Sequence, residues 1–155
     1  ETLQVARQAL QELLNKMHLR AHIVTQWGEA TEGEERPLLL DVEGDDLSLL
    51  IGRRGETLAA LQYILRLIVN KQLNSVVNII VDVESYKSRR EEQLKRLAQR
   101  LAEQATQQRR TLSLEPMPAN ERRIVHLTLR DHPDVMTESV GEGELRKVTV
   151  VPKKK

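Results

Sequence analysis

Cysteine and phenylalanine are both absent from this chain of 155 residues. Without cysteine there is no disulfide framework and no thiolate metal site, which is typical of a reducing compartment and leads us to expect a cytoplasmic protein. Only Trp27, Tyr63 and Tyr86 are aromatic. Nucleic-acid binders that stack bases on aromatic side chains need more aromatic residues than this. Any such binding here would have to use backbone groups, charge and aliphatic contacts.

Long hydrophobic runs are absent as well. No apolar stretch approaches the roughly 18 residues that span a bilayer, so we expect no direct membrane insertion. The chain opens with the amphipathic segment ETLQVARQALQELLNKM rather than a signal peptide. Because the first residue is not Met, we expect that further residues precede it.

Charge is distributed unevenly, although the net charge is only +1. Between Glu29 and Asp46 there are eight acidic residues and one basic residue, Arg36. From Glu84 to Arg130 there are eleven Lys and Arg residues against six acids. This segregation indicates a basic face that could meet an anion such as nucleic acid, although an ordinary solvated surface would give a similar pattern.

Hydrophobic periodicity predicts the order α-β-β-α-α-β for the first half. The predicted segments are helices over 1–17, 45–51 and 56–71 and strands over 19–27, 37–44 and 75–84. In the longest internal helix the predicted buried residues repeat at helical spacing; they are Leu58, Leu61, Ile64, Leu65 and Ile68. The predicted fold class is α+β, with a first domain over residues 1–84.

For the second half of the chain, the sequence pattern predicts the approximate order α-β-α-β-β. We expect this half to form a domain over residues 85–155. A highly charged helix over 85–110 either joins this domain to the first or carries a surface for a protein partner. An extended segment over 111–116, a helix over 118–131 and two strands over 135–140 and 145–151 follow. The sequence GEGE joins the last two strands in a hairpin.

Gly52, Arg53, Arg54 and Gly55 interrupt two predicted helices. A helix N-terminus presents unpaired N–H groups and a partial positive charge. Glycine has no Cβ, so a phosphodiester backbone can approach closely, and the two arginines can contact phosphates. Taken alone, this tetrapeptide is more often a plain turn between helices. It is not a nucleotide P-loop, because no Gly-Lys-Ser/Thr follows.

The segment IGRRGETLAAL resembles the Ile-Gly-x-x-Gly element of KH domains, and the predicted order of elements matches the type II arrangement of that fold. The resemblance implies that Gly52, Arg53, Arg54 and Gly55 clamp the backbone of unpaired nucleotides. It also implies an aliphatic groove for the bases, with Ile51 and Leu58 in its wall.

In NERRIVHLTLRD, Arg122 and His126 are four residues apart and share a helix face. An isolated pair of this kind is usually a solvated arginine and a structural histidine. The spacing nevertheless resembles the R-three-H nucleic-acid-binding domain, a small α/β unit that closes with a hairpin. The resemblance implies contacts from Arg122, Arg123, His126 and Arg130. We expect affinity to rise as pH falls through about 6.5, where histidine normally titrates.

A KH domain followed directly by an R-three-H domain resembles the bacterial Jag family, also called the KhpB RNA-binding proteins, over nearly all of the chain. The resemblance implies a protein that binds single-stranded RNA as a post-transcriptional regulator or RNA chaperone, with single-stranded DNA as an alternative ligand. It also implies a small KH-only protein partner and a link to membrane-protein insertion or the cell envelope. An adaptor that docks proteins is therefore the alternative function.

Catalytic motifs are weak in this sequence. His18 and His22 are four residues apart, but a predicted strand separates them and no third metal ligand lies nearby. The segment 131–134, DHPD, contains two carboxylates and an imidazole, but it is typical of a turn that ends a helix. No nucleophile elbow, zinc-protease helix or Walker motif is present. We predict no catalytic residue, metal or cofactor; a nuclease that depends on Asp131 or Asp134 is the less favoured alternative.

Overall fold

A computed structural model describes residues 1–154 of the chain. The chain divides into two compact units at Lys87 and Ser88, and each unit has a hydrophobic core of its own. Both units combine helices with a small sheet, so the predicted α+β fold class is confirmed. Among the described residues, no helix has the length and apolar character needed to cross a membrane.

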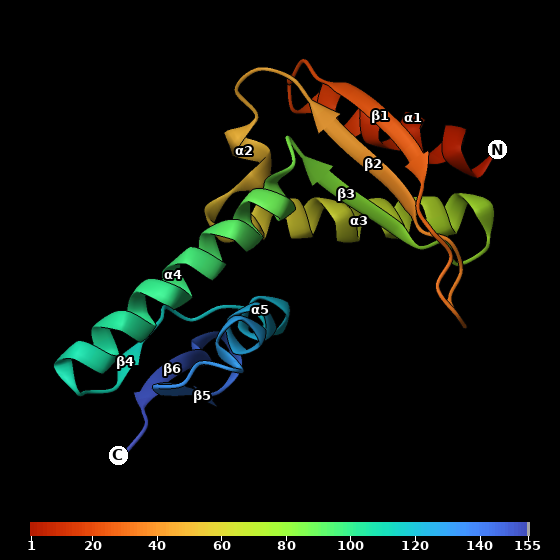
Figure 1. The fold of residues 1–155 in the computed structure, drawn as a ribbon. Helices are drawn as coiled ribbons and strands as arrows, with labels where there is room; N and C mark the ends of the chain where they lie inside the picture. The colour runs from red at the N-terminus through yellow and green to blue at the C-terminus, as the bar shows by residue number, and fades with distance from the viewer. Residues whose placement is uncertain (155) are drawn as a thin grey trace. The chain divides into compact units, whose positions relative to one another are not determined.

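The first unit has the predicted order of elements (Figure 1). These are α1 (Thr2–Lys16), β1 (His22–Trp27), β2 (Leu38–Glu43), α2 (Ser48–Ile51), the 3-10 turn η1 (Arg53–Gly55), α3 (Glu56–Leu73) and β3 (Ile79–Val83). The sheet has the order β1-β2-β3; β1 pairs with β2 in antiparallel fashion, and β2 pairs with β3 in parallel.

The core of the first unit lies between α1, α3 and one face of the sheet. Leu38, Leu40 and Val42 of β2 are fully buried, as expected from the period of two in a strand. On α3 the buried residues are Leu58, Leu61, Leu65 and Val69. The prediction that Ile64 is buried was wrong, because its side chain is 46% exposed. It lies next to Tyr63 on the solvent side of the helix.

The edge strand β3 is bordered by polar side chains from α3. The Asn70 side-chain oxygen accepts a hydrogen bond from the Val77 N–H (2.9 Å), and the Gln62 side-chain oxygen accepts one from the Val81 N–H (2.9 Å). Between them, Arg66 Nε donates to the Ile79 carbonyl (2.7 Å). Helix α3 thus supplies partners for outward-facing backbone groups that a sheet edge would otherwise leave to solvent.

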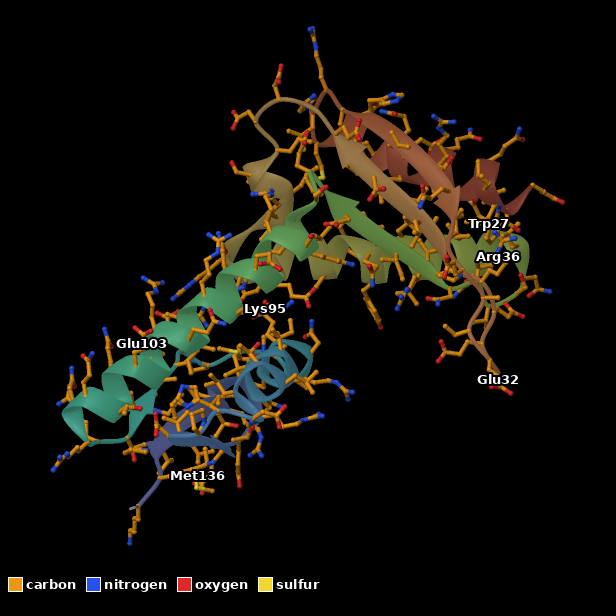
Figure 2. The ribbon with its side chains drawn as sticks, viewed as in Figure 1. Trp27, Glu32, Arg36, Lys95, Glu103 and Met136 are labelled. Atoms are coloured by element: carbon orange, nitrogen blue, oxygen red, sulfur yellow. The ribbon has the colours of Figure 1, made fainter. Side chains whose placement is uncertain are left out.

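The acidic connection between β1 and β2 is held at its base by Trp27 and Arg36 (Figure 2). The guanidinium carbon of Arg36 lies 6.0 Å from the centre of the Trp27 ring, within cation–π range. Arg36 Nε also donates to the Gly28 carbonyl (3.0 Å). The single base in this acidic stretch therefore closes the hairpin.

The second unit is built from the remaining elements. They are most of α4 (Tyr86–Gln108), then β4 (Leu112–Ser113), α5 (Ala119–Leu129), β5 (Val135–Val140), the 3-10 turn η2 (Gly143–Leu145) and β6 (Lys147–Pro152). The sheet has the order β4-β6-β5 and is antiparallel throughout. The predicted α-β-α-β-β order and the closing hairpin are confirmed.

The core of the second unit combines small residues of α4 with apolar residues of α5 and the sheet. Ala98, Ala102 and Ala105 are fully buried along α4 and permit close packing. On β5, Val135 is buried whereas Met136 is 47% exposed (Figure 2). Thr137 and Ser139 continue the series that starts at Val135 and are half-buried, so this row of β5 changes from apolar to polar.

Candidate functional site

The loop Gly52–Gly55, called the GRRG loop below, connects α2 to α3 through an unusual backbone path. Gly52 has φ 70° and ψ −174°, a region that is essentially restricted to glycine. Gly55 is the N-cap of α3 and is left-handed, with φ 79°. Arg54 also has a positive φ of 55°. The chain can end one helix and begin the next within four residues because glycine tolerates these angles.

The space where side chains would project from the two glycines is occupied by the protein itself. A Cβ at Gly52 would lie 2.9 Å from the Thr57 backbone nitrogen and would also contact the Thr57 hydroxyl. A Cβ at Gly55 would lie 2.8 Å from the ring of Tyr86. The loop's own packing therefore requires both glycines, in addition to any room that they leave for a ligand.

The side chains around the GRRG loop differ in what they offer to a ligand. Arg53 is exposed, whereas Arg54 is half-buried and interacts with other residues of the protein. Ile51 is half-buried and packs against the core. Leu58 is only 2% exposed and belongs to the hydrophobic core of the first unit, and its place in a groove wall stays a prediction. Arg53 is the side chain best placed to meet an anion.

A second cluster of arginines surrounds an open hollow of about 570 Å³ in the second unit, called the arginine hollow below. Its lining runs along α5, from the first turn to Arg130 at the C-cap, and includes parts of the closing hairpin; the residues are Ala119, Asn120, Arg122, Arg123, His126, Leu127, Arg130, Ser139 and Arg146. All four residues that the R-three-H resemblance implied are in this set. The structure brings these four residues together around one hollow.

Arg146 and Ser139 are the lining residues that come from the closing hairpin, and the sequence interpretation missed both. Arg146 follows η2, well beyond α5 in the sequence, and its Nη1 donates to the Gly141 carbonyl (2.7 Å). Ser139 comes from β5. The only sequence signal was a basic residue just after the turn of a predicted hairpin, which is too common to single out.

His126 is engaged on both sides of its ring. Nδ1 lies 2.7 Å from the Thr137 hydroxyl, and Nε2 lies 2.8 Å from the Ser139 hydroxyl. Burial lowers the pKa of His126 below its usual range, and the positive charges of Arg122 and Arg146 lower this pKa further. The imidazole is therefore neutral at pH 7. The predicted gain in affinity as pH falls should begin below 6.5, not at the ordinary histidine value.

A nearly buried ion pair holds α5 against α4. Arg90 Nε donates to one carboxylate oxygen of Glu121 (2.9 Å), and Nη2 donates to the other (3.2 Å). The side chains are 22% and 7% exposed, respectively. Such a two-pronged contact fixes direction as well as distance. It positions the first turn of α5, from which Arg122 and Arg123 reach the hollow.

The residues considered for catalysis do not form a recognisable site. In DHPD, the Asp134 N–H donates to Nδ1 of His132 (3.0 Å), which is a local turn contact. His18 and His22 are both exposed, on either side of the turn between α1 and β1. Within residues 1–154, no three His, Cys, Asp or Glu side chains are grouped so that they could hold a metal ion.

Comparisons with known proteins match both units. A family model described as the KH domain of KhpA and KhpB matches residues 7–83, and one described as the R-three-H domain matches residues 92–152. The chain is 37% identical over 151 residues to the RNA-binding protein KhpB of Clostridium symbiosum, covering 97% of this chain and 66% of that protein.

Two further relatives carry the same name. The RNA-binding protein KhpB of Bacillus subtilis strain 168 is 39% identical over 73% of this chain and 55% of its own length. That of Lactiplantibacillus plantarum is 38% identical over 68% of this chain and 33% of its own length. The chain thus spans between a third and two thirds of the length of these three relatives.

Proposed function

This chain belongs to the KhpB family, in which a KH domain precedes an R-three-H domain, and we propose that it binds single-stranded RNA through the GRRG loop and the arginine hollow. The observation that carries the proposal is shared by the two sites. Arg53 and Arg54 directly precede α3. The hollow begins at Ala119 and Asn120 in the first turn of α5, and its arginines follow along the helix and from the hairpin. A helix N-terminus also favours an anion through its backbone N–H groups and its dipole. The names of the curated relatives supply RNA as the class of ligand.

The two sites suit a flexible strand better than a duplex. The lining of the hollow contains no Phe, Tyr or Trp, and the ring of Tyr86 lies close to Gly55 of the loop, so we expect most of the affinity to come from phosphates and from short aliphatic contacts. Arg53 at the GRRG loop provides one exposed positive charge, and four arginines surround the hollow. Each site alone would bind weakly. Two sites on one strand gain avidity because the second contact is intramolecular.

The test replaces Arg53 and Arg54 together with Asp and measures binding of polyuridine to the full chain at about 150 mM salt. Reversal of both charges should weaken binding at least tenfold, since each charged contact to phosphate contributes roughly 1.5 kcal/mol or more. Lys71, in the last turn of α3, gives the matched control, with Lys71→Asp expected to change little. Unchanged affinity in the double variant would exclude the GRRG loop as a binding site.

The proposal also covers the domain boundaries, the cellular role and the protein partner of this chain. We place the KH domain at residues 1–84 and the R-three-H domain at residues 85–155, and we propose that the protein acts in the cytoplasm as a regulator or chaperone of RNA. Binding is its activity and no catalysis is required. A small KH-only protein is the proposed partner. To decide between RNA and single-stranded DNA, the affinity for an RNA strand is compared with that for a DNA strand of matching sequence, because only RNA has 2′-hydroxyl groups.

A further inference from the structure

His126 has no ring nitrogen available for a ligand in this structure. Thr137 and Ser139 lie two residues apart on the same face of β5, and their hydroxyls approach the two sides of the imidazole at 2.7 and 2.8 Å. A phosphate could contact the ring only by displacing one of these hydroxyls. Ser139 lines the arginine hollow, as His126 does, and is half-buried. Its hydroxyl is hydrogen-bonded to Nε2, so two residues of the lining are joined to each other.

The hydrogen-bonding capacity of these three groups restricts how their protons are arranged. A neutral imidazole has one N–H donor and one bare acceptor nitrogen. If Nε2 carries the proton, it donates to Ser139, and the Ser139 O–H is free to point into the hollow. Nδ1 then accepts from the Thr137 O–H. In the opposite tautomer the Ser139 proton is held by Nε2, and only a lone pair faces the hollow.

Building on the proposed function, we infer that the Ser139 hydroxyl contacts an RNA phosphate and that neutral His126 positions this hydroxyl. The order of donation is Thr137 O–H to Nδ1, Nε2–H to the Ser139 oxygen, and Ser139 O–H to a phosphate oxygen. Each hydrogen bond in such a chain polarises the next, so the terminal O–H becomes a better donor to an anion.

The charges around the hollow favour donation from the Ser139 O–H to a bound anion. Arg122, Arg123 and Arg130 line it from α5, and Arg146 lines it from the hairpin. No acidic residue is part of the lining among the described residues, and Glu138 is exposed on the other face of β5. The bound anion accepts hydrogen bonds only, so the hydroxyl that faces it must donate. The lowered pKa of His126 is consistent with a neutral ring in this surrounding.

The first experiment compares Ser139→Ala with Ser139→Thr in the full chain, with polyuridine as the probe. Loss of one hydrogen bond to a charged group should weaken binding about tenfold in Ser139→Ala. Ser139→Thr keeps the hydroxyl on a strand that favours threonine, so its affinity should equal that of the unaltered chain. Both variants should remain folded, as thermal unfolding can check, because Ser139 is only half-buried and is not part of the hydrophobic core.

A second comparison tests the positioning role of His126. The side-chain nitrogen of Gln can occupy the place of Nε2 and donate to Ser139, so His126→Gln should recover most of the binding that His126→Ala loses. Nitrogen NMR of the imidazole at neutral pH should show Nε2 protonated and Nδ1 bare. A purely structural histidine would give neither the glutamine rescue nor a preference for this tautomer that strengthens when polyuridine is added.

The outcomes separate this inference from the proposed function. If the unaltered chain failed to bind polyuridine, the proposed function would be wrong and this inference would fail with it. If the chain bound but Ser139→Ala bound equally well, only the role of Ser139 would be overturned. An imidazole protonated at Nδ1 alone would overturn the order of donation and the positioning role of His126.

Discussion

The GRRG loop and the arginine hollow both present arginines beside a helix start, but they are assembled differently. The loop is four consecutive residues whose backbone angles, set by Gly52 and Gly55, create the site. The hollow combines α5 with the closing hairpin, and its geometry depends on packing between elements. A local site fails when its backbone changes, whereas an assembled site fails when one of its elements shifts. Variants should therefore affect the two sites in different ways.

The largest effect is expected from Gly52→Ala. Alanine at this φ and ψ is strained, and its methyl group would contact Thr57, so the first unit should lose about 3 kcal/mol of stability. Gly143→Ala is the matched control, because Gly143 also has a positive φ but a Cβ there would have nothing within 4 Å. The second unit should therefore lose only about 1 kcal/mol of stability. Amide hydrogen exchange measures the stability of each unit separately. Equal losses in the two variants would contradict the packing argument.

Glu121→Gln should have the next largest effect, and on the second unit only. It removes the charge that faces Arg90 in a nearly buried pair. Breaking a fully buried pair costs roughly 3–5 kcal/mol, and because Arg90 is partly exposed we expect about 2 kcal/mol. Glu103→Gln neutralises an exposed carboxylate on α4 and should change little (Figure 2). If amide hydrogen exchange in α5 were the same in Glu121→Gln as in the unaltered chain, the Arg90–Glu121 pair would not hold α5 against α4.

Arg146→Ala should weaken RNA binding without unfolding either unit. The change removes one of four arginines at the hollow, so the slope of log affinity against log salt should fall by about 0.7, the value for one phosphate on a single strand. Lys95→Ala on α4 removes the same charge outside the hollow and serves as the control. A slope equal to that of the unaltered chain would show that Arg146 makes no phosphate contact.

The smallest effect concerns the pH dependence of stability in the second unit. Because the pKa of His126 is lowered in the folded state, the unfolded chain binds a proton more readily. The contribution of His126 to stability is thus complete above about 6.5 and is lost as pH falls through the lower folded value. Nitrogen NMR of the ring gives that value directly, and His126→Gln should abolish this part of the pH dependence. A midpoint at or above about 6.5 would contradict the effect of burial.

Much of the fold could be predicted from local pattern. The sequence predicted a strand over 37–44, and the structure confirms it as β2, with Leu38, Leu40 and Val42 buried on one face. The GRRG loop was visible because its residues are contiguous. The exposed Ile64 was predicted wrongly because an apolar residue at helical spacing can face solvent as easily as core.

Contacts between distant elements explain what the sequence could not provide. Arg90 and Glu121 are 31 residues apart, and nothing in their local sequence indicates that they pair. The same is true of His126 with Thr137 and Ser139, whose meeting depends on how α5 packs against β5. Periodicity assigns a residue to a face of its own element. It does not say which residue of another element lies opposite.

The polar row on α3 has a consequence for self-association. Asn70, Arg66 and Gln62 are each four residues apart, a rise of about 6 Å. Their backbone partners, on β3 and in the segment just before it, are two residues apart, which is about 6.6 Å in an extended chain. The near match lets one straight helix serve successive residues of an edge. A strand from another chain would have to displace these side chains before it could pair with β3. Growth of the sheet into a fibril is therefore disfavoured at this edge.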